Sequence, residues 1–230
     1  MTEAKDAFFS GAKAISPLIL GVVPFALIAG ISAVGAGLSP LEALGMSYIV
    51  FAGASQLAAV ELIGQNAPVA VIVATALVIN LRFSMYSAAL APHFHGLSLS
   101  WRGVLAYLMT DQAFAISIAS YGKGRKSCKH WYYLGAALTM WCVWQTGTAA
   151  GVFLGARIPP SWSLEFAIPL TFLALLFPAL KDRPSIGAAI VAGLLALAGH
   201  GLPYNLGLFL AAIGGIAAGV MMEERLKRAV

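Results

Sequence analysis

Two apolar stretches, PVAVIVATALVINLRFSMYSAALAP (residues 68–92) and WRGVLAYLMTDQAFAISIASY (residues 101–121), decide how this chain folds. Each carries one ionisable residue near its middle, Arg82 in the first and Asp111 in the second. A charge at the centre of an apolar segment is costly in lipid, so it usually faces protein, water or a substrate. The pattern predicts membrane-embedded segments with a polar centre.

The spacing of these two charges suggests that they meet. Arg82 lies ten residues before Pro92, and Asp111 lies ten residues after Trp101. If the connection 93–100 places Pro92 and Trp101 at one membrane face, both charges lie roughly 15 Å deep in a layer roughly 30 Å thick. We therefore expect two antiparallel helices joined by an Arg82–Asp111 pair. Such a pair either locks helices together or takes part in transport, and the two roles are compatible.

The composition of the whole chain is that of a membrane protein. Of its 230 residues, 60% are hydrophobic and 10% are charged, and the mean hydropathy is +0.86; a soluble domain is about 25% charged. Apolar runs this long without alternation predict helices, because backbone groups in lipid must be bonded within their own segment. We predict an all-α polytopic membrane protein, one transmembrane domain over residues 1–230, with about eight apolar segments: 15–34, 41–63, 68–92, 101–121, 131–156, 164–180, 184–201 and 204–222. Broken or re-entrant segments would lower the number of crossings to seven or six.

Basic residues between the segments predict the orientation. With the N-terminus inside, the inside connections hold eleven of the fourteen Lys and Arg residues, and the outside connections hold two, Arg102 and Arg157. This bias places both termini in the cytoplasm. The connection 64–67 is an exception, because it falls inside and carries no positive charge. The net charge of +5 belongs to these connections, so we expect lipid around the chain and no nucleic-acid partner.

An internal repeat is indicated by corresponding residues in two halves, 15–121 and 131–222. Gly35 and Pro40 recur as Gly155 and Pro160, an offset of 120. The same offset sets Asn80 opposite His200, and the copies can be parallel or inverted. The sequence around His200, Gly199-His200-Gly201-Leu202-Pro203, is either a second helix break or only a turn between helices.

Small residues recur every four positions in the last segment and, less regularly, in the first. Such stripes let another helix approach closely, from this chain or from a partner subunit. The stripes are Gly207, Ala211, Gly215 and Gly219, and Ala29, Ala33 and Gly37.

Familiar enzyme motifs for phosphate binding, zinc hydrolysis and serine hydrolysis are absent from the sequence. The two cysteines, Cys128 and Cys142, are too few and too differently placed for a metal site, and we take them as free thiols. An intramembrane protease built on Ser55, Ser84 and His200 lacks any arranging motif. We therefore expect a protein that is not an enzyme and binds no cofactor.

Polar residues inside the apolar segments are the candidates for a binding site. Ser55 and Gln56 stand out, because the small residues beside them let a backbone or a substrate come close. Taken singly, each Ser, Thr or Gln more often bonds across helices than touches a ligand. Ser47 and Trp144-Gln145-Thr146 are further polar interruptions.

Three of these stretches resemble one known family. They are Phe-Ala-Gly-Ala-Ser-Gln (51–56), Asn-Leu-Arg-Phe-Ser-Met-Tyr-Ser-Ala-Ala-Leu-Ala-Pro-His-Phe (80–94) and Leu-Met-Thr-Asp-Gln-Ala-Phe-Ala (108–115). They are similar to the AzlC family, the large subunit of branched-chain amino acid exporters. The resemblance implies a multi-pass inner or plasma membrane protein of a bacterium or archaeon. It also implies a small AzlD-type membrane partner and export of valine, leucine, isoleucine or methionine.

The chemistry of such a substrate suits the candidate residues. A branched amino acid needs a cation for its carboxylate, an anion for its ammonium group and an apolar pocket for its side chain. Arg82 and Asp111 meet the first two needs. The predicted substrate-binding residues are Ser55, Gln56, Asn80, Arg82, Tyr86, Asp111 and Gln112.

Export against a gradient needs an energy source, and without a nucleotide site we expect the proton gradient. Asp111 or Glu61 would then carry the proton, and Glu61 is the better candidate if Arg82 pairs with Asp111. A passive channel for small polar solutes and a structural subunit whose partner holds the site are the alternatives.

Overall fold

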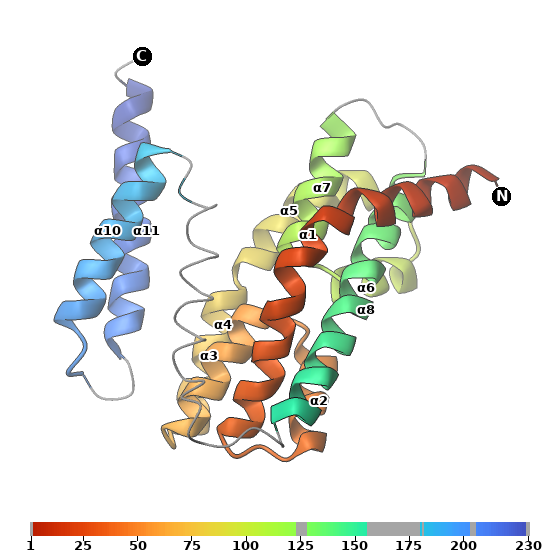
Figure 1. Cartoon of the computed structure of the whole chain (residues 1–230). Coiled ribbons are helices and arrows are strands. Elements are labelled where there is room, and N and C mark those ends of the chain that lie inside the picture. The colour runs from red at the N-terminus through yellow and green to blue at the C-terminus, as the bar shows by residue number, and fades with distance from the viewer. Residues whose placement is uncertain (1, 123–127, 156–179, 181, 203–205, 229–230) are drawn as a thin grey trace. The chain divides into compact units, whose positions relative to one another are not determined.

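The computed structural model describes residues 2–122, 128–155, 180, 182–202 and 206–228 (Figure 1). The regular structure in these ranges is helical, which confirms the all-α prediction. The first of two compact units contains α1 to α8, apart from the start of α4, and the second contains α10 and α11. The predicted segment 164–180 lies outside the described residues, apart from Leu180.

Two long helices, α1 (Thr2–Gly35) and α8 (Lys129–Gly155), form the core of the first unit and run side by side (Figure 1). Gly11 abuts the backbone of Tyr132 near their N-terminal ends, and Gly30 abuts that of Thr148 and Val152 further along. The two helices are therefore parallel. A Cβ atom on Gly30 would lie 2.6 Å from the backbone nitrogen of Val152, so the close approach requires glycine.

The predicted segment 41–63 is a hairpin of two half-helices, α2 (Pro40–Val50) and α3 (Gly53–Gly64). Ala43, near the start of α2, and Val60, near the end of α3, pack in one cluster with Ala33 and Val152. Both outer ends of the hairpin therefore lie beside the C-terminal ends of α1 and α8. The chain turns back at Phe51, which is in the left-handed region (φ 40°, ψ 50°).

The predicted segment 101–121 is a second hairpin, made of α6 (Leu99–Tyr107) and α7 (Asp111–Gly122). At its start, the ring of Trp101 packs 5.2 Å from that of Trp131. At its end, the Tyr121 hydroxyl donates to the Lys129 carbonyl at 2.8 Å. Both contacts involve the first turn of α8, so the α6–α7 hairpin enters the unit from the end opposite to the α2–α3 hairpin.

Between the hairpins, α4 (Val69–Asn80) and α5 (Arg82–Phe94) run from one end of the unit to the other, interrupted at Leu81. Bonds from Leu81 to Val78 and from Ser84 to Leu81 replace the α-helical pattern there by a tighter turn. The apolar segment 68–92 therefore contains two half-helices that meet at residues 80–82. At the far end of α5, His93 Nδ1 lies 3.0 Å from Lys129 Nζ.

The hairpins correct two of the predicted connections. Because residues 101–121 fold back instead of crossing, the connection 93–100 and the described residues Gly122 and Lys129 lie at the same end of the unit, beside the N-terminal part of α1. Gly64, at the start of the connection 64–67, lies at the other end of the unit, where its Cβ position is 3.7 Å from Ala36. Among described residues of this unit, the end that holds the α1 N-terminus carries Lys5, Lys13, Arg102 and Lys129, and the other end carries no Lys or Arg.

The two hairpins share local features. Ser39 and Ser98 cap their first half-helices with nearly equal backbone angles, and each second half-helix has twelve residues and ends at a glycine. These positions are 59 residues apart for the serines and 58 for Gly64 and Gly122. The repeat with an offset of 120 stays a prediction.

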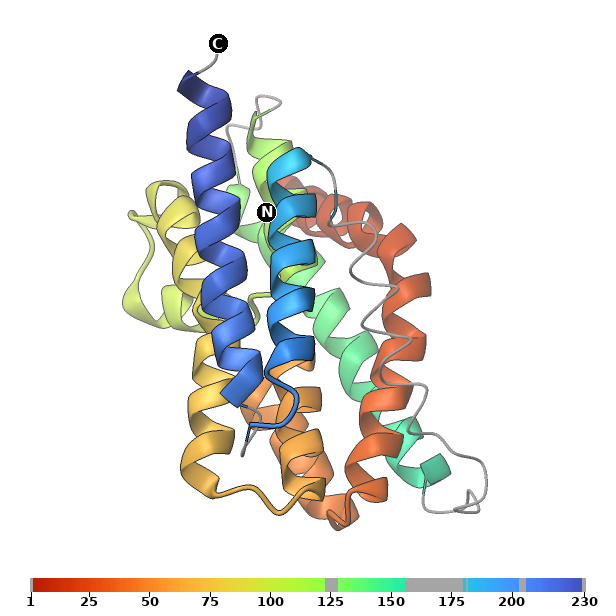
Figure 2. The same cartoon turned by 90° about the vertical axis from the view of Figure 1, so that its left-hand side faces the viewer.

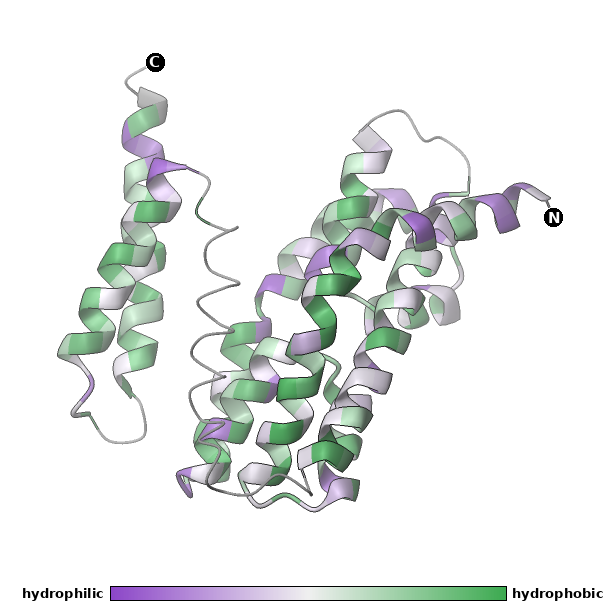
Figure 3. Ribbon diagram, viewed as in Figure 1, coloured by the Kyte–Doolittle hydropathy of each residue, from purple (hydrophilic) through white to green (hydrophobic). Residues whose placement is uncertain are grey.

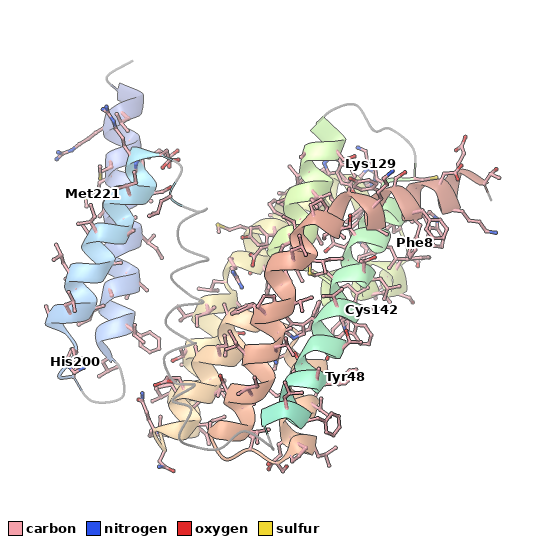
Figure 4. All side chains as sticks on the ribbon, viewed as in Figure 1. Phe8, Tyr48, Lys129, Cys142, His200 and Met221 are labelled. Carbon is pink, nitrogen blue, oxygen red and sulfur yellow. The ribbon has the colours of Figure 1, made fainter. Side chains whose placement is uncertain are left out.

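The second unit is an antiparallel pair, α10 (Arg183–Ala198) and α11 (Leu206–Arg228), side by side in both views (Figures 1 and 2). Gly215 and Gly219 face Ala188, and Gly207 meets Gly199 backbone to backbone. The small-residue stripe of α11 thus packs against its own chain. His200 lies in the turn after α10, at the opposite end of the pair from Met221 (Figure 4), so this region is a turn and not a helix break.

The stripe on α1 holds only in part. Ala29 and Ala33 are buried, whereas Gly37 lies beyond the helix end with φ of 92°. The prediction that Gly37 continues the stripe is wrong, because the helix has already turned into a loop there.

Three described helices are long and apolar enough to cross a membrane: Thr2–Gly35, Val69–Phe94 and Leu206–Leu226. Colouring by hydropathy shows a hydrophilic N-terminal end of α1 and a mostly hydrophobic remainder (Figure 3). With 27 residues, α8 is about 40 Å long, which also exceeds the thickness of a bilayer core.

Candidate functional site

Side chains in the first turn of α3 hydrogen-bond the backbone at the break between α2 and α3. Gln56 Oε1 accepts from the Ala52 backbone nitrogen at 3.2 Å, and the Ser55 hydroxyl donates to the Ala52 carbonyl at 2.9 Å. Both side chains are buried. A non-glycine residue with positive φ, such as Phe51, is strained and needs a surrounding structure that holds it in place.

The holding structure comes from α8. The Trp144 indole donates to the Ser47 hydroxyl at 3.1 Å, and that hydroxyl lies 2.9 Å from Gln145 Oε1. Gln145 Nε2 also donates to the Ser47 carbonyl at 3.2 Å. At the start of α3, a Cβ atom on Gly53 would lie 2.5 Å from the Trp144 ring. These three buried polar side chains therefore fasten the end of α2 to α8.

The break between α4 and α5 is tied to the first hairpin through Asn80. Its Nδ2 donates to the Ser55 hydroxyl at 3.0 Å. This bond joins the last residue of α4 to the first turn of α3, and its acceptor, Ser55, is fully buried.

The same break is tied to the second hairpin through Arg82. Its guanidinium forms an ion pair with Asp111 at 2.8 Å, which confirms the predicted pairing. The expected antiparallel arrangement is wrong for the two helices that begin at these residues, because Tyr86 packs on Phe114 and His93 on Tyr121, so α5 and α7 run parallel. The Tyr86 hydroxyl donates to the other oxygen of Asp111 at 2.9 Å, and the Tyr86 ring stacks on that of Phe114 at 4.3 Å. The carboxylate stands at the first residue of α7, where the helix dipole favours a negative charge.

Three helix breaks therefore meet through side chains. We call Ser55, Gln56, Asn80, Arg82, Tyr86 and Asp111 the break cluster. Six of the seven predicted binding residues belong to it. Half-helix ends of this kind, with polar side chains beside them, line substrate and ion sites in transporters.

The break cluster keeps unused hydrogen-bonding capacity. Among the described residues, Asn80 Oδ1 and Arg82 Nε are buried and have no partner. The ion pair is not sealed, because the Arg82 and Asp111 side chains are 28% and 39% exposed. A free acceptor, a free donor and a reachable ion pair suit a ligand that carries both charges.

Two predicted residues lie outside these contacts. Gln112 follows Asp111 and is half-buried, with no side-chain hydrogen bond to the described part of the chain. Glu61 is exposed near the end of α3 and accepts from Gln65 Nε2 at 2.9 Å. The thiols of Cys128 and Cys142 are free, as predicted.

The sequence interpretation missed Tyr107, the last residue of α6. Its hydroxyl donates to the Tyr48 carbonyl and accepts from the Trp141 indole at 3.1 Å. Tyr48 and Tyr107 are 59 residues apart, the same separation as the two capping serines. This shared spacing is a signal in the sequence from which corresponding positions in two hairpins could have been inferred.

Comparison with known proteins gives a consistent result. Residues 17–158 match the model of the AzlC protein family. An uncharacterized membrane protein of Archaeoglobus fulgidus is 34% identical, over 92% of this chain and 94% of its own length. Inner membrane protein YgaZ of Escherichia coli is 25% identical over 93% and 88%, and an uncharacterized membrane protein of Helicobacter pylori is 26% identical over 90% and 91%. No solved structure matches the chain.

Proposed function

This chain belongs to the AzlC family of membrane proteins, and on that premise we propose that it exports branched-chain or other neutral amino acids. The proposed activity is secondary transport across the inner or plasma membrane, without enzymatic chemistry. The observation that carries the proposal is the Arg82–Asp111 pair, reachable at two helix breaks and flanked by unpaired polar atoms.

The chemistry of the break cluster matches a zwitterion. The substrate carboxylate would bind the Arg82 guanidinium, whose Nε–H is unused among described residues. The substrate ammonium group would bind Asp111 and the unused Asn80 Oδ1. Phe83, 5.1 Å from the guanidinium, and Phe114 would supply apolar walls for the side chain.

The basic residues support a cytoplasmic N-terminus. All described Lys and Arg residues of the first unit except Arg82 lie at the end that holds the N-terminus. In the second unit, Arg183 and the basic C-terminal residues of α11 share one end of the helix pair, and the turn at the other end carries none among described residues. We place this end in the cytoplasm as well, and we expect a small AzlD-type membrane subunit as the partner.

We propose that the proton gradient drives export. The Asp111 carboxylate already forms an ion pair with Arg82 and accepts a hydrogen bond from Tyr86. Glu61 has no cation within ion-pair distance in the described chain and is exposed, so we favour it as the group that exchanges protons.

Efflux of preloaded radiolabelled valine, with and without the small partner, tests the proposal. Asp111→Asn and Arg82→Gln should each abolish efflux, whereas Arg102→Gln, the same change at an exposed arginine of α6, should not. Direct binding to the purified protein separates the roles, because isobutylamine lacks the carboxylate and isovalerate lacks the amine, and binding can be measured in variants that transport nothing. Asp111→Asn should weaken binding of the amine, and Arg82→Gln should weaken binding of the acid. Full efflux in either variant would refute the assignment.

A passive channel is the second candidate, favoured by the partial exposure of the ion pair. An imposed valine gradient should move protons if the protein is an exporter and should move none if it is a channel. Proton movement that persists in Glu61→Gln would exclude Glu61 as the carrier.

A further inference from the structure

The tips of the two opposed hairpins touch at Tyr48 and Tyr107. Tyr107 is the last residue of α6, and Tyr48 lies in the last turn of α2. The Tyr107 hydroxyl bonds the Tyr48 carbonyl, and its ring lies 6.2 Å from the Phe51 ring. The Tyr48 ring packs 5.6 Å from Trp141 (Tyr48 is labelled in Figure 4). These contacts therefore join the α2–α3 break to the α6–α7 break.

The Tyr107 hydroxyl pairs with a backbone carbonyl at the C-terminal end of α2. The last four carbonyls of a helix have no partner within it. The Ser47 carbonyl receives the Phe51 and Gln145 nitrogens, and the Tyr48 carbonyl receives the Tyr107 hydroxyl. An unpaired carbonyl away from water is costly, so this bond, together with the bond from the Trp141 indole to the same hydroxyl, gives the α6 tip a preferred position.

The α6–α7 hairpin is the less firmly held of the two. One residue of α6 and three of α7 are buried, compared with two of α2 and six of α3. The α2–α3 hairpin is fastened to α8 by the Ser47, Trp144 and Gln145 bonds. An element with few buried contacts opens at a lower free-energy cost than one with many.

The loosely held tip also carries half of the ion pair. Asp111 comes four residues after Tyr107, and the residues between them form the break from α6 to α7. Any swing of this tip that separates Tyr107 from Tyr48 would also move Asp111 relative to Arg82. We therefore expect opening of the tip to change access to the ion pair.

We propose that the Tyr107 hydroxyl is a latch that holds the α6–α7 tip closed against the α2–α3 hairpin, and that this tip moves during each transport cycle. The part that concerns transport rests on the proposed function. Tyr107 is thus a positioning residue, which controls how often the break cluster opens without binding the substrate itself.

Two single-atom changes test the latch. Tyr107→Phe removes the bonded hydroxyl and keeps the ring contact with Phe51. Tyr48→Phe is the matched control, because it keeps the carbonyl that accepts the bond, and the Tyr48 hydroxyl makes no hydrogen bond to the described residues. Met109→Cys is the reporter, since Met109 is 7% exposed and lies within the break. Cys128→Ser and Cys142→Ser remove the native thiols.

The full-length protein in lipid vesicles is then labelled with a water-soluble maleimide. Tyr107→Phe loses both hydrogen bonds of its hydroxyl, to the Tyr48 carbonyl and from the Trp141 indole, and should raise the labelling rate of Met109→Cys at least about fivefold. Tyr48→Phe should leave that rate unchanged. An unchanged rate in Tyr107→Phe overturns the latch, and so does an equal increase in Tyr48→Phe. A melting temperature close to that of the parent in both variants excludes general unfolding as the cause.

Transport supplies the second readout. With the native residue at 109, Tyr107→Phe should change the maximal valine efflux rate and leave KM within about twofold, because a latch alters opening more than binding. A change in KM alone would overturn the positioning role. If the parent protein moves no amino acid but the labelling difference is present, the proposed function fails and the latch stands. If efflux is present and the labelling difference is absent, the latch alone fails.

Discussion

Replacing Gly30 by alanine should loosen the parallel contact between α1 and α8. A Cβ atom at this position would overlap the Thr148 carbonyl and lie 2.6 Å from the Val152 nitrogen, where 3.4 Å is an ordinary contact. The helices would have to separate locally by at least 0.8 Å, which is 3.4 minus 2.6. The obstructing atoms are backbone, so no side-chain rotation relieves the overlap.

Gly21→Ala, in the same helix, is the matched control because nothing lies within 4 Å of its Cβ position. Replacing glycine by alanine favours the helix by about 1 kcal/mol at either position. This contribution therefore cancels when the two variants are compared. The remaining difference is the overpacking cost, typically about 1–3 kcal/mol, and the backbone contacts place it toward the upper value.

The two variants are compared by reversible unfolding in mixed detergent micelles, followed by tryptophan fluorescence. Gly30→Ala should unfold at a lower fraction of denaturing detergent than Gly21→Ala. Gly151→Ala, which would overlap the Leu27 carbonyl, should behave like Gly30→Ala. Equal stability of Gly30→Ala and Gly21→Ala would refute the close parallel packing of α1 and α8.

Two further outcomes follow from named contacts. Ser47→Ala should destabilise the protein by about 1–3 kcal/mol, because it leaves buried Trp144 and Gln145 without their partner, and a Thr148→Val control, whose hydroxyl has no partner among described residues, should cost less in the same unfolding assay. The Ser185 hydrogen bond holds the pKa of the Asp182 carboxyl below its usual range, so its stabilisation of the α10 N-terminus is present at neutral pH and is lost as the pH falls through that lowered pKa. The protection factor of the Ser185 amide, which is its exchange rate relative to an unstructured peptide at the same pH, should therefore fall in acid, and Asp182→Asn should remove that pH dependence.

The break cluster was predictable because charge in an apolar segment is rare and expensive. Arg82 and Asp111 were identified at equal depth from residue spacing alone, and the structure joins them at 2.8 Å. Asn80 and Ser55 were each identified singly, but nothing in the sequence indicated that they bond each other. That contact depends on how the α2–α3 hairpin lies against the α4–α5 break.

Hydropathy alone could not identify the two hairpins. Residues 41–63 and 101–121 are long enough to cross a membrane, and an apolar run looks the same whether it crosses or turns back. What turns them back is local: the left-handed Phe51 in one, and the Thr110 hydroxyl that accepts from the Ala113 nitrogen at 3.2 Å in the other. The fold-back also moved Arg102 to the end that carries the N-terminus.

The sequence by itself determined that this is a helical membrane protein, that its centre is polar, and that Arg82 and Asp111 can pair. Composition and residue spacing carry that information, because the cost of exposing polar groups to lipid acts on every segment separately. Only the tertiary structure decided that two segments are opposed hairpins, that α1 and α8 run parallel, and that Tyr107 holds the Tyr48 carbonyl. These features depend on contacts between residues far apart in the chain, and such contacts exist only once the helices have packed.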